Sequence, residues 1–364
     1  MGEFYADVGG FNGLYNLLVR ASGDARDTLD YTKRHCDMPA ASEGYLMMLI
    51  GPHQVAYDNL TEALTRLSDL AQGAGTQVNA AQGDYARSDQ AAAVRLDAGY
   101  PGARNAADLR GTLAQGRPDL RAERVGFSDV AEPAGHLRNP EYAVGIEMWS
   151  INPLADLISP AAWLRQISIW LFSHDPFEGW SKQFSGDWQA YVHCAVAMGN
   201  IGGAAQDTGR NLISGAQDVS AIWRGNAAEA EQEFQLALGN AAMALNGACG
   251  QYKQLYNQAA EATKKLFDVV SGLISDLIDL LIIINVSAAA GTALIETGVG
   301  AVAGYGVAAY YTWQAYDLYK EISTCYGNAE DLIKAIGGSI SSVRAALDVR
   351  DLPSMQPYRH PAVD

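Results

Sequence analysis

Basic residues are scarce in this chain and are nowhere concentrated. Lys and Arg number 25 against 41 Asp and Glu, which gives a formal net charge of −16. Nucleic-acid binding and simple attraction to anionic lipid both depend on clustered positive charge. We therefore expect neither a nucleic-acid partner nor electrostatic recruitment to an anionic membrane.

Motifs for catalysis and metal binding are absent as well. The sequence has no H-E-x-x-H, C-x-x-C, G-x-S-x-G or G-x-x-x-x-G-K-[ST] pattern. Its six histidines are scattered, and the two that adjoin a cysteine, His35 and His193, point to a different helix face from that cysteine. The Gly-x-Gly pairs at 298–300 and 304–306 lack the preceding strand of a phosphate loop. We expect no enzymatic activity, no metal and no cofactor.

Helical periodicity dominates what is present, in two long patterns that meet at Trp223-Arg224-Gly225. The first runs over residues 181–222 and the second over 226–264. The second repeats apolar residues in steps of four and three, as a helix packed lengthwise on another helix requires. Gly225 frees the backbone for a tight reversal, and Trp223 brings a large ring to the turn. We expect an all-α, elongated protein with an antiparallel helical hairpin here.

Cysteines are few, and two of them flank this turn. Cys194 lies 29 residues before Trp223, and Cys249 lies 24 residues after Gly225. Their midpoint at residues 221–222 places them at the same height in an antiparallel hairpin, which predicts a Cys194–Cys249 disulfide. The alternative is a pair of buried free thiols that pack as small apolar residues. Nothing beyond arithmetic pairs the remaining two cysteines, Cys36 and Cys325.

A second helical hairpin is predicted in residues 1–99. Its first helix spans residues 11–36, and its second carries the most regular apolar seam, from Leu60 to Tyr85. We expect Gly51-Pro52 to interrupt the chain ahead of that seam, with the proline starting a helix. Tyr85 and Asp89 close the second helix on one shared face. From spacing alone they are a last seam tyrosine followed by a solvated aspartate.

The rest of the chain divides by composition. Residues 100–152 contain prolines, glycines and mixed charge, and are expected to be a linker or surface loops. The unit 153–265 should begin with an amphipathic helix over 153–172, interrupted near Pro160, before the hairpin. Residues 266–350 form an apolar helical region that ends in an amphipathic helix over 322–347. The tail, 351–364, is expected to be loose.

Residues 266–316 are the most apolar part of the chain. The charges between Leu266 and Tyr316 are all acidic, and residues 297–316 form an uncharged run of 20, about the length that spans a bilayer. Gly300, Gly304 and Ala308 recur every four residues, a small-residue face for close helix contact. Two interpretations stay open: core helices of a bundle or of an oligomer interface, or a hairpin that enters a membrane.

A W-x-G hinge between two long antiparallel helices resembles the WXG superfamily, whose members are substrates of the type VII (ESX) secretion system. Tyr85-Ala-Arg-Ser-Asp89 resembles their Y-x-x-x-D secretion signal, and residues 89–96 resemble the tail of EspC-like members. The order of N-terminal hairpin, loop, Gly186-Asp-Trp188 and W-x-G hairpin is similar to the EspB-like family. That family joins in one chain the halves that PE and PPE proteins supply as partners. The resemblance covers roughly residues 10–265.

The resemblance implies a non-enzymatic actinobacterial protein, secreted or held in the cell envelope. Residues 1–7 have no basic or apolar region, so we expect no cleaved signal peptide, as in these substrates. A type VII secretion ATPase or chaperone would read Tyr85 and Asp89, beside a turn shaped by Trp223 and Gly225. After export the protein would self-associate into a homo-oligomer, with the small residues from Gly300 to Ala308 as packing candidates. The alternative is a membrane-active, pore-forming effector that uses the hairpin 266–316.

Overall fold

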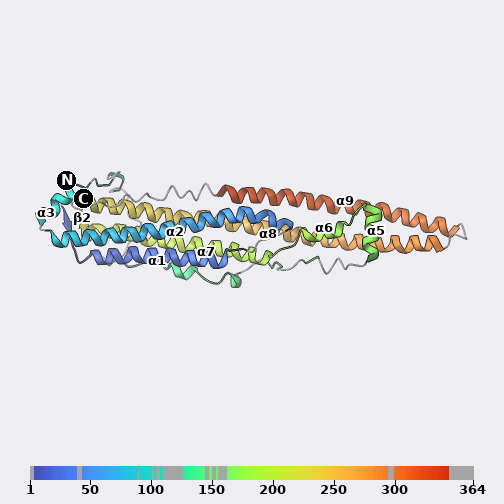
Figure 1. Cartoon of the computed structure of the whole chain (residues 1–364), viewed down its shortest axis with the longest axis horizontal. Helices are drawn as coiled ribbons and strands as arrows, with labels where there is room; N and C mark the ends of the chain where they lie inside the picture. The colour runs from blue at the N-terminus through green and yellow to red at the C-terminus, as the bar shows by residue number, and fades with distance from the viewer. Residues whose placement is uncertain are drawn as a thin grey trace.

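The computed structural model is an elongated bundle of long helices (Figure 1). It describes residues 4–38, 43–88, 90–100, 102–103, 107–109, 113, 126–143, 147–149, 153–154, 162–293 and 299–343. Within these residues the strands are a single two-residue pair, β1 (Tyr5–Ala6) and β2 (Trp223–Arg224). The predicted all-α class and the elongated arrangement of helical hairpins are confirmed.

The first hairpin consists of α1 (Phe11–His35) and α2 (Gly44–Arg87). The seam residues predicted from spacing are buried, among them Leu18 of α1 and Leu64 of α2. α1 ends with Lys33, Arg34 and His35 in its last turn. Basic side chains stabilise a helix there because its carbonyl end carries partial negative charge.

The interruption expected at Gly51-Pro52 is wrong, since α2 continues through both residues over its 44 residues. Pro52 lies in the third turn and has no N–H to bond to the carbonyl of Met48. Packing holds the helix together on either side, because Leu49 and its neighbours one turn away are buried. α9 packs against this stretch of α2. Gly337 of α9 leaves room for the proline ring: a Cβ there would lie 3.3 Å from Pro52 Cγ.

The second hairpin consists of α7 (Trp188–Ile222) and α8 (Asn226–Ala293), joined through β2. α7 begins later than the pattern predicted, because Asp187 caps it: its carboxylate accepts a hydrogen bond from the N–H of Ala190 at 2.9 Å. The two backbones approach closely at Gly209 and Gly239. A Cβ at Gly209 would lie 2.5 Å from the Gly239 carbonyl oxygen, and one at Gly239 would lie 2.8 Å from that of Gly209.

α8 is 68 residues long and does not end with the hairpin. The boundary predicted between residues 265 and 266 falls inside it, because its buried seam continues without a break through Val270, Ile274, Leu277, Leu281 and Ile284. α9 (Val299–Ser342) returns along α8 and then along α2. The helices predicted over 297–316 and 322–347 therefore belong to one helix. Figure 1 shows α8 and α9 projecting together beyond the ends of α1, α2 and α7.

Three short helices cover parts of this frame. α3 (Gln90–Ala98) follows α2 at one end of the bundle (Figure 1). α5 (Ala162–Phe172) contacts α8 and α9, and Phe172 stacks on Tyr319 of α9 with ring centroids 4.5 Å apart. α6 (Pro176–Lys182) is capped by Asp175, whose carboxylate accepts from the N–H of Phe177. The helix predicted over 153–172 is described only as α5, and Pro160 lies outside the described residues.

Part of the predicted linker is an ordered strap, residues 126–143, which includes the 3-10 helices η2 (Pro133–His136) and η3 (Pro140–Ala143). It lies along α1 and α7. Arg20 Nε donates to Asp129 Oδ2 at 2.8 Å, and the Tyr31 hydroxyl donates to the carbonyl of Arg138 at 2.6 Å. The tail 351–364 lies outside the described residues.

Candidate functional site

Four segments that are distant in sequence meet at one end of the bundle, which we call the tip: residues 4–12, 82–88, 90–100 and 222–229. Figure 1 shows α3, β2 and the N-terminal end of the chain together there. Of the four predicted signal residues, Tyr85, Trp223 and Gly225 all lie in the tip. Asp89 lies outside the described residues.

The tip is organised around a cluster of four aromatic rings from three segments. Trp223 packs on Phe11 with ring centroids 4.9 Å apart, and Tyr85 meets Trp223 edge to face at 6.0 Å. Tyr85 also contacts Phe11 at 6.0 Å and Phe4 at 5.5 Å. Trp223 is 2% exposed and Tyr85 6%. Such tilted and edge-to-face pairs are favourable beyond the area they bury, so the two motif aromatics share one core.

The chain reverses at Gly225, whose φ of +136° is strained for any residue with a Cβ. β1 pairs antiparallel with β2, so that Tyr5 lies opposite Arg224 and Ala6 opposite Trp223. Just beyond the pair, the N–H of Asp7 donates to the carbonyl of Ile222 at 2.7 Å. The N-terminal segment thus uses backbone groups that the end of α7 leaves free.

Asp97 of α3 locks the start of α8 and was not identified from sequence. Its carboxylate accepts from the N–H of Asn226 at 2.9 Å and from that of Ala227 at 3.0 Å. In return the Asn226 side chain donates to the carbonyls of Asp97 and Tyr100. A carboxylate on the free N–H groups of a helix start satisfies them and favours the dipole. No local spacing reveals such a cap, because it comes from another helix.

The exposed side chains of the tip are polar or amphipathic. Arg224 is exposed, and its guanidinium carbon lies 5.6 Å from the centre of the half-exposed Tyr5 ring, a cation–π arrangement. Arg87 lies in the last turn of α2 and pairs with Asp84 at 2.6 Å. These groups are available to a partner, whereas the motif aromatics lie beneath them.

The predicted Cys194–Cys249 disulfide is not formed, since both residues are buried free thiols. The hairpin register explains the error. Cys249 faces Gly202, whose Cβ would lie 2.9 Å from that of Cys249. Gly202 is eight residues beyond Cys194, roughly 12 Å along the helix at 1.5 Å per residue. The Cys194 side chain is instead hydrogen-bonded to that of Cys36 at the end of α1.

The thiols lie in a buried region whose groups are held in their neutral forms. Burial raises the pKa of Cys249 to about 12, and burial lowers the pKa of His53. His53 joins the Tyr256 hydroxyl, at 2.7 Å, to the carbonyl of Cys36, at 2.9 Å. Such thiols are poor nucleophiles, and the described residues contain no group of His, Cys, Asp and Glu placed to hold a metal. This region connects three helices and is structural.

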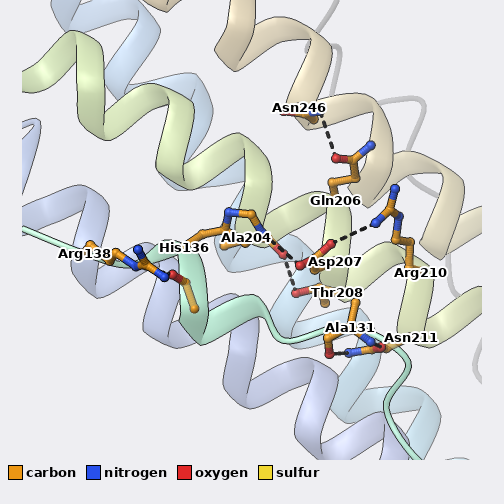
Figure 2. A network of polar contacts seen from close by, with 11 residues as sticks. Ala131, His136, Arg138, Ala204, Gln206, Asp207, Thr208, Arg210, Asn211 and Asn246 are labelled. Atoms are coloured by element: carbon orange, nitrogen blue, oxygen red, sulfur yellow. Dashed lines mark hydrogen bonds and ion pairs between the residues drawn. The ribbon is translucent and has the colours of Figure 1, made fainter. Parts of the chain in front are cut away.

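A second polar network fixes the strap to α7, as Figure 2 shows. His136 Nε2 lies 2.9 Å from Asp207 Oδ2, and Arg210 reaches the other oxygen of the same carboxylate at 3.5 Å. The Asn211 side-chain oxygen accepts from the N–H groups of Val130 and Ala131, both at 2.9 Å. Every one of these polar groups is used to hold the strap, which leaves none in position to act on a substrate.

The small-residue face predicted at Gly300, Gly304 and Ala308 lies on α9. Ala308 is buried, and the surroundings of the two glycines lie outside the described residues. One described helix is long and apolar enough to cross a membrane by length and composition: α8 within 226–287, where an 18-residue window has a mean hydropathy of 2.1. Of that window, 28% is buried.

The chain matches no protein-family model, no curated protein and no solved structure. Its function therefore has to be inferred from the tip and from the projecting part of α8 and α9.

Proposed function

We propose that this protein is a substrate of a type VII secretion system, exported without a cleaved signal peptide to the medium or the cell envelope. The observation that carries the proposal is the contact between Tyr85 and Trp223, whose rings meet at 6.0 Å although the two motifs lie in different hairpins. Two motifs that resemble the halves of an export signal thus lie at one end of one chain.

The geometry of the tip supports a composite recognition surface rather than two separate motifs. β1 is held against β2, and Asp97 ties α3 to the start of α8. Because Tyr85 and Trp223 are buried, their role in this proposal is to hold the surrounding segments in register. A secretion ATPase or chaperone would then contact the exposed groups above them, such as Arg224 and Tyr5.

Secretion of point variants from a host with a type VII system tests the proposal. Tyr85→Ala and Trp223→Ala should leave most of the protein in the cell pellet, because each opens the aromatic core of the tip. Asp89→Asn should also reduce export, since it alters the motif itself. Trp223→Phe should be exported better than Trp223→Ala, because a ring still fills the core. Immunoblots of culture filtrate and pellet measure the distribution.

Two matched controls separate recognition from folding. Tyr57→Ala removes a tyrosine from the middle of α2, and Trp170→Ala removes an exposed tryptophan from α5. Both should be exported like the wild type, and circular dichroism should show all variants folded. Equal export from a strain that lacks the secretion ATPase would refute the proposal, and so would equal losses in the two controls.

Self-association after export is the second half of the proposal and concerns a different part of the chain. The small residues Gly300, Gly304 and Ala308 remain the packing candidates. Light scattering of the purified protein, and of Gly304→Leu, would show whether an oligomer exists and whether this face carries it.

A further inference from the structure

The part of the bundle that projects is apolar on its outside as well as on its inside. We call this the arm, residues 266–293 of α8 and 299–316 of α9. The seam between the two helices uses one stripe of α8, the buried residues from Val270 to Ile284. The opposite face of an ordinary surface helix would be polar. Here it carries large exposed apolar and aromatic side chains: Val269, Ile282, Ile283 and Val286 on α8, and Val307, Tyr310, Trp313 and Tyr316 on α9.

Aromatic side chains gather at the base of the arm. Trp170 of α5 is 71% exposed and Trp313 of α9 is 64% exposed. Tyr310 and Tyr316 lie one turn to either side of Trp313 on α9 and are about half exposed. Trp and Tyr are enriched where a protein passes from water into hydrocarbon. Beyond them the arm has limbs of 14 residues in α8, from Leu280, and 18 in α9, to Tyr316, or about 21 and 27 Å at 1.5 Å per residue. The hydrocarbon core of a bilayer is about 30 Å thick.

The ionisable groups of the arm, its tyrosines aside, are carboxyls only. Between Leu266 and Tyr316 the charged residues are Asp268, Asp276, Asp279 and Glu296, and no Lys or Arg occurs. A carboxyl that enters a medium of low dielectric takes up a proton, since burial there disfavours its charged form. A lysine or arginine would have to be carried in as a cation at any acidic pH. The arm has none, so proton uptake alone makes it neutral.

A buried core, a signal sequence and a dimer interface each fit this apolar helix less well. A core helix of a water-soluble protein is mostly buried, whereas 28% of the apolar window of α8 is buried. A signal sequence lies near an N-terminus, and this window lies in residues 226–287. A second copy would bring another arm with the same negative charges, and like charges without partners oppose close packing. Anionic lipid headgroups would repel the arm for the same reason.

We propose that the arm is a membrane-inserting hairpin that enters a zwitterionic bilayer at mildly acidic pH. The proposal is independent of the export proposal and stands or falls by itself. Insertion requires protons on Asp276 and Asp279, which line a groove with Trp313, Asp317 and Glu321 of α9. The other charges near them are engaged elsewhere: Lys320 lies over the Tyr316 ring at 4.6 Å, Arg165 of α5 faces Asp175, and Asp268 faces Lys264.

Flotation of the full chain with phosphatidylcholine vesicles tests the proposal. The protein should float with vesicles at about pH 5 and stay at the bottom at about pH 7.5, because the membrane-bound fraction gains about tenfold per pH unit for each proton taken up. The double variant Asp276→Asn, Asp279→Asn should bind at the higher pH and show a shallower pH dependence. Vesicles containing phosphatidylglycerol should bind no better than phosphatidylcholine at either pH.

A matched pair of lysine variants locates the site. Val286→Lys places a lasting positive charge on the exposed face of the arm and should abolish flotation at about pH 5. Val55→Lys makes the same change at an exposed site of α2 and should float like the wild type. Failure of the folded wild-type protein to float at about pH 5, or flotation of Val286→Lys, would overturn the proposal. So would light scattering at that pH, without vesicles, that shows a dimer which Val286→Lys dissolves.

Discussion

At the scale of single residues, Gly225 is the position where one methyl group should do the most damage. Its φ of +136° lies where side chains are strained, and a Cβ there would collide with the Asp97 carboxylate. Gly225→Ala should lower the free energy of unfolding by about 1–3 kcal/mol through backbone strain. Displacement of Asp97 should add about 1 kcal/mol for the lost helix cap. Urea denaturation followed by circular dichroism measures both.

Gly250 of α8 is the matched control for that substitution. It is an exposed helical glycine, and a Cβ there would meet no atom within 4 Å. Gly250→Ala should raise stability by up to about 1 kcal/mol, because alanine favours the helix. If the two variants shift the denaturation midpoint in the same direction, the account of the turn is wrong.

The cysteines give a second prediction at this scale. Burial raises the pKa of Cys249 to about 12, and that of Cys36 lies well above its ordinary value through its hydrogen bond to Cys194 and burial. Because thiolates and not thiols react, these cysteines should resist a disulfide reagent at about pH 8 in the folded protein, while the half-buried Cys325 reacts. After unfolding without reductant all four should react. Only two would do so if Cys194 and Cys249 were bridged.

Residue-level prediction from sequence succeeded where the cause was local and failed where it was not. Gly225 and Trp223 could be identified because a turn needs backbone freedom and an apolar ring needs burial. Asp97 gave no signal, because its role depends on α3 meeting α8 in space. The disulfide failed for a related reason: residue counts about a turn assume a symmetric hairpin, and the register places Cys249 against Gly202.

At the scale of elements, the close approach of α7 and α8 depends on Gly209 and Gly239. A Cβ at Gly209 would lie 2.5 Å from the Gly239 carbonyl oxygen and 2.6 Å from Met243 Cγ. Gly209→Ala should therefore cost about 1–3 kcal/mol by overpacking, although alanine is the better helix former. Thermal unfolding measures the change. Gly247→Ala on the exposed side of α8, where a Cβ would meet nothing within 4 Å, should have the opposite sign.

Helix existence could be predicted from the heptad spacing, but helix ends could not. α2 continues through Pro52 and α8 continues past Lys265, because packing against α9 outweighs a local breaker and a shift in composition. The outer face of the arm also escaped prediction. Spacing shows that residues are apolar, and only the arrangement of the helices shows which of them are left uncovered.

At the scale of the whole molecule, buried carboxyls make the bundle respond to pH. Burial raises the pKa of Glu231 from 4.5 to about 7, and that of Asp218 from 3.8 to about 6. Burial, with the nearby Asp129 and Asp27, raises that of Asp24 to about 6. Each folded-state pKa lies above its unfolded value, so the folded state binds more protons in between. Stability is fully present below the unfolded pKa and is lost as pH rises through the folded one.

The melting temperature should therefore rise as pH falls from about 8 to about 5, at about 1.4 kcal/mol per pH unit for each group within its window. Glu231→Gln should stabilise the protein by about 2 kcal/mol at about pH 8 and have little effect at about pH 5. Gln235 would still find an acceptor, because its side chain donates to Glu231 Oε1 at 2.8 Å. The exposed Glu261→Gln on the same helix has the same charge change and should alter neither value. Calorimetry across the pH range measures these shifts.

This pH dependence separates insertion of an arm from collapse of the whole fold. Over the interval from about pH 7.5 to about pH 5 the bundle carboxyls add stability while the arm carboxyls become able to lose their charge. Acid-induced membrane binding through a molten globule would instead require the bundle to loosen. At about pH 5 without lipid, the near-ultraviolet circular dichroism of the buried tryptophans Trp188 and Trp223 should persist, and a dye that binds exposed apolar surface should gain signal only through the arm. Val286→Lys should reduce that dye signal and leave the near-ultraviolet spectrum unchanged, whereas a spectrum that fades on acidification would mean that the bundle opens first.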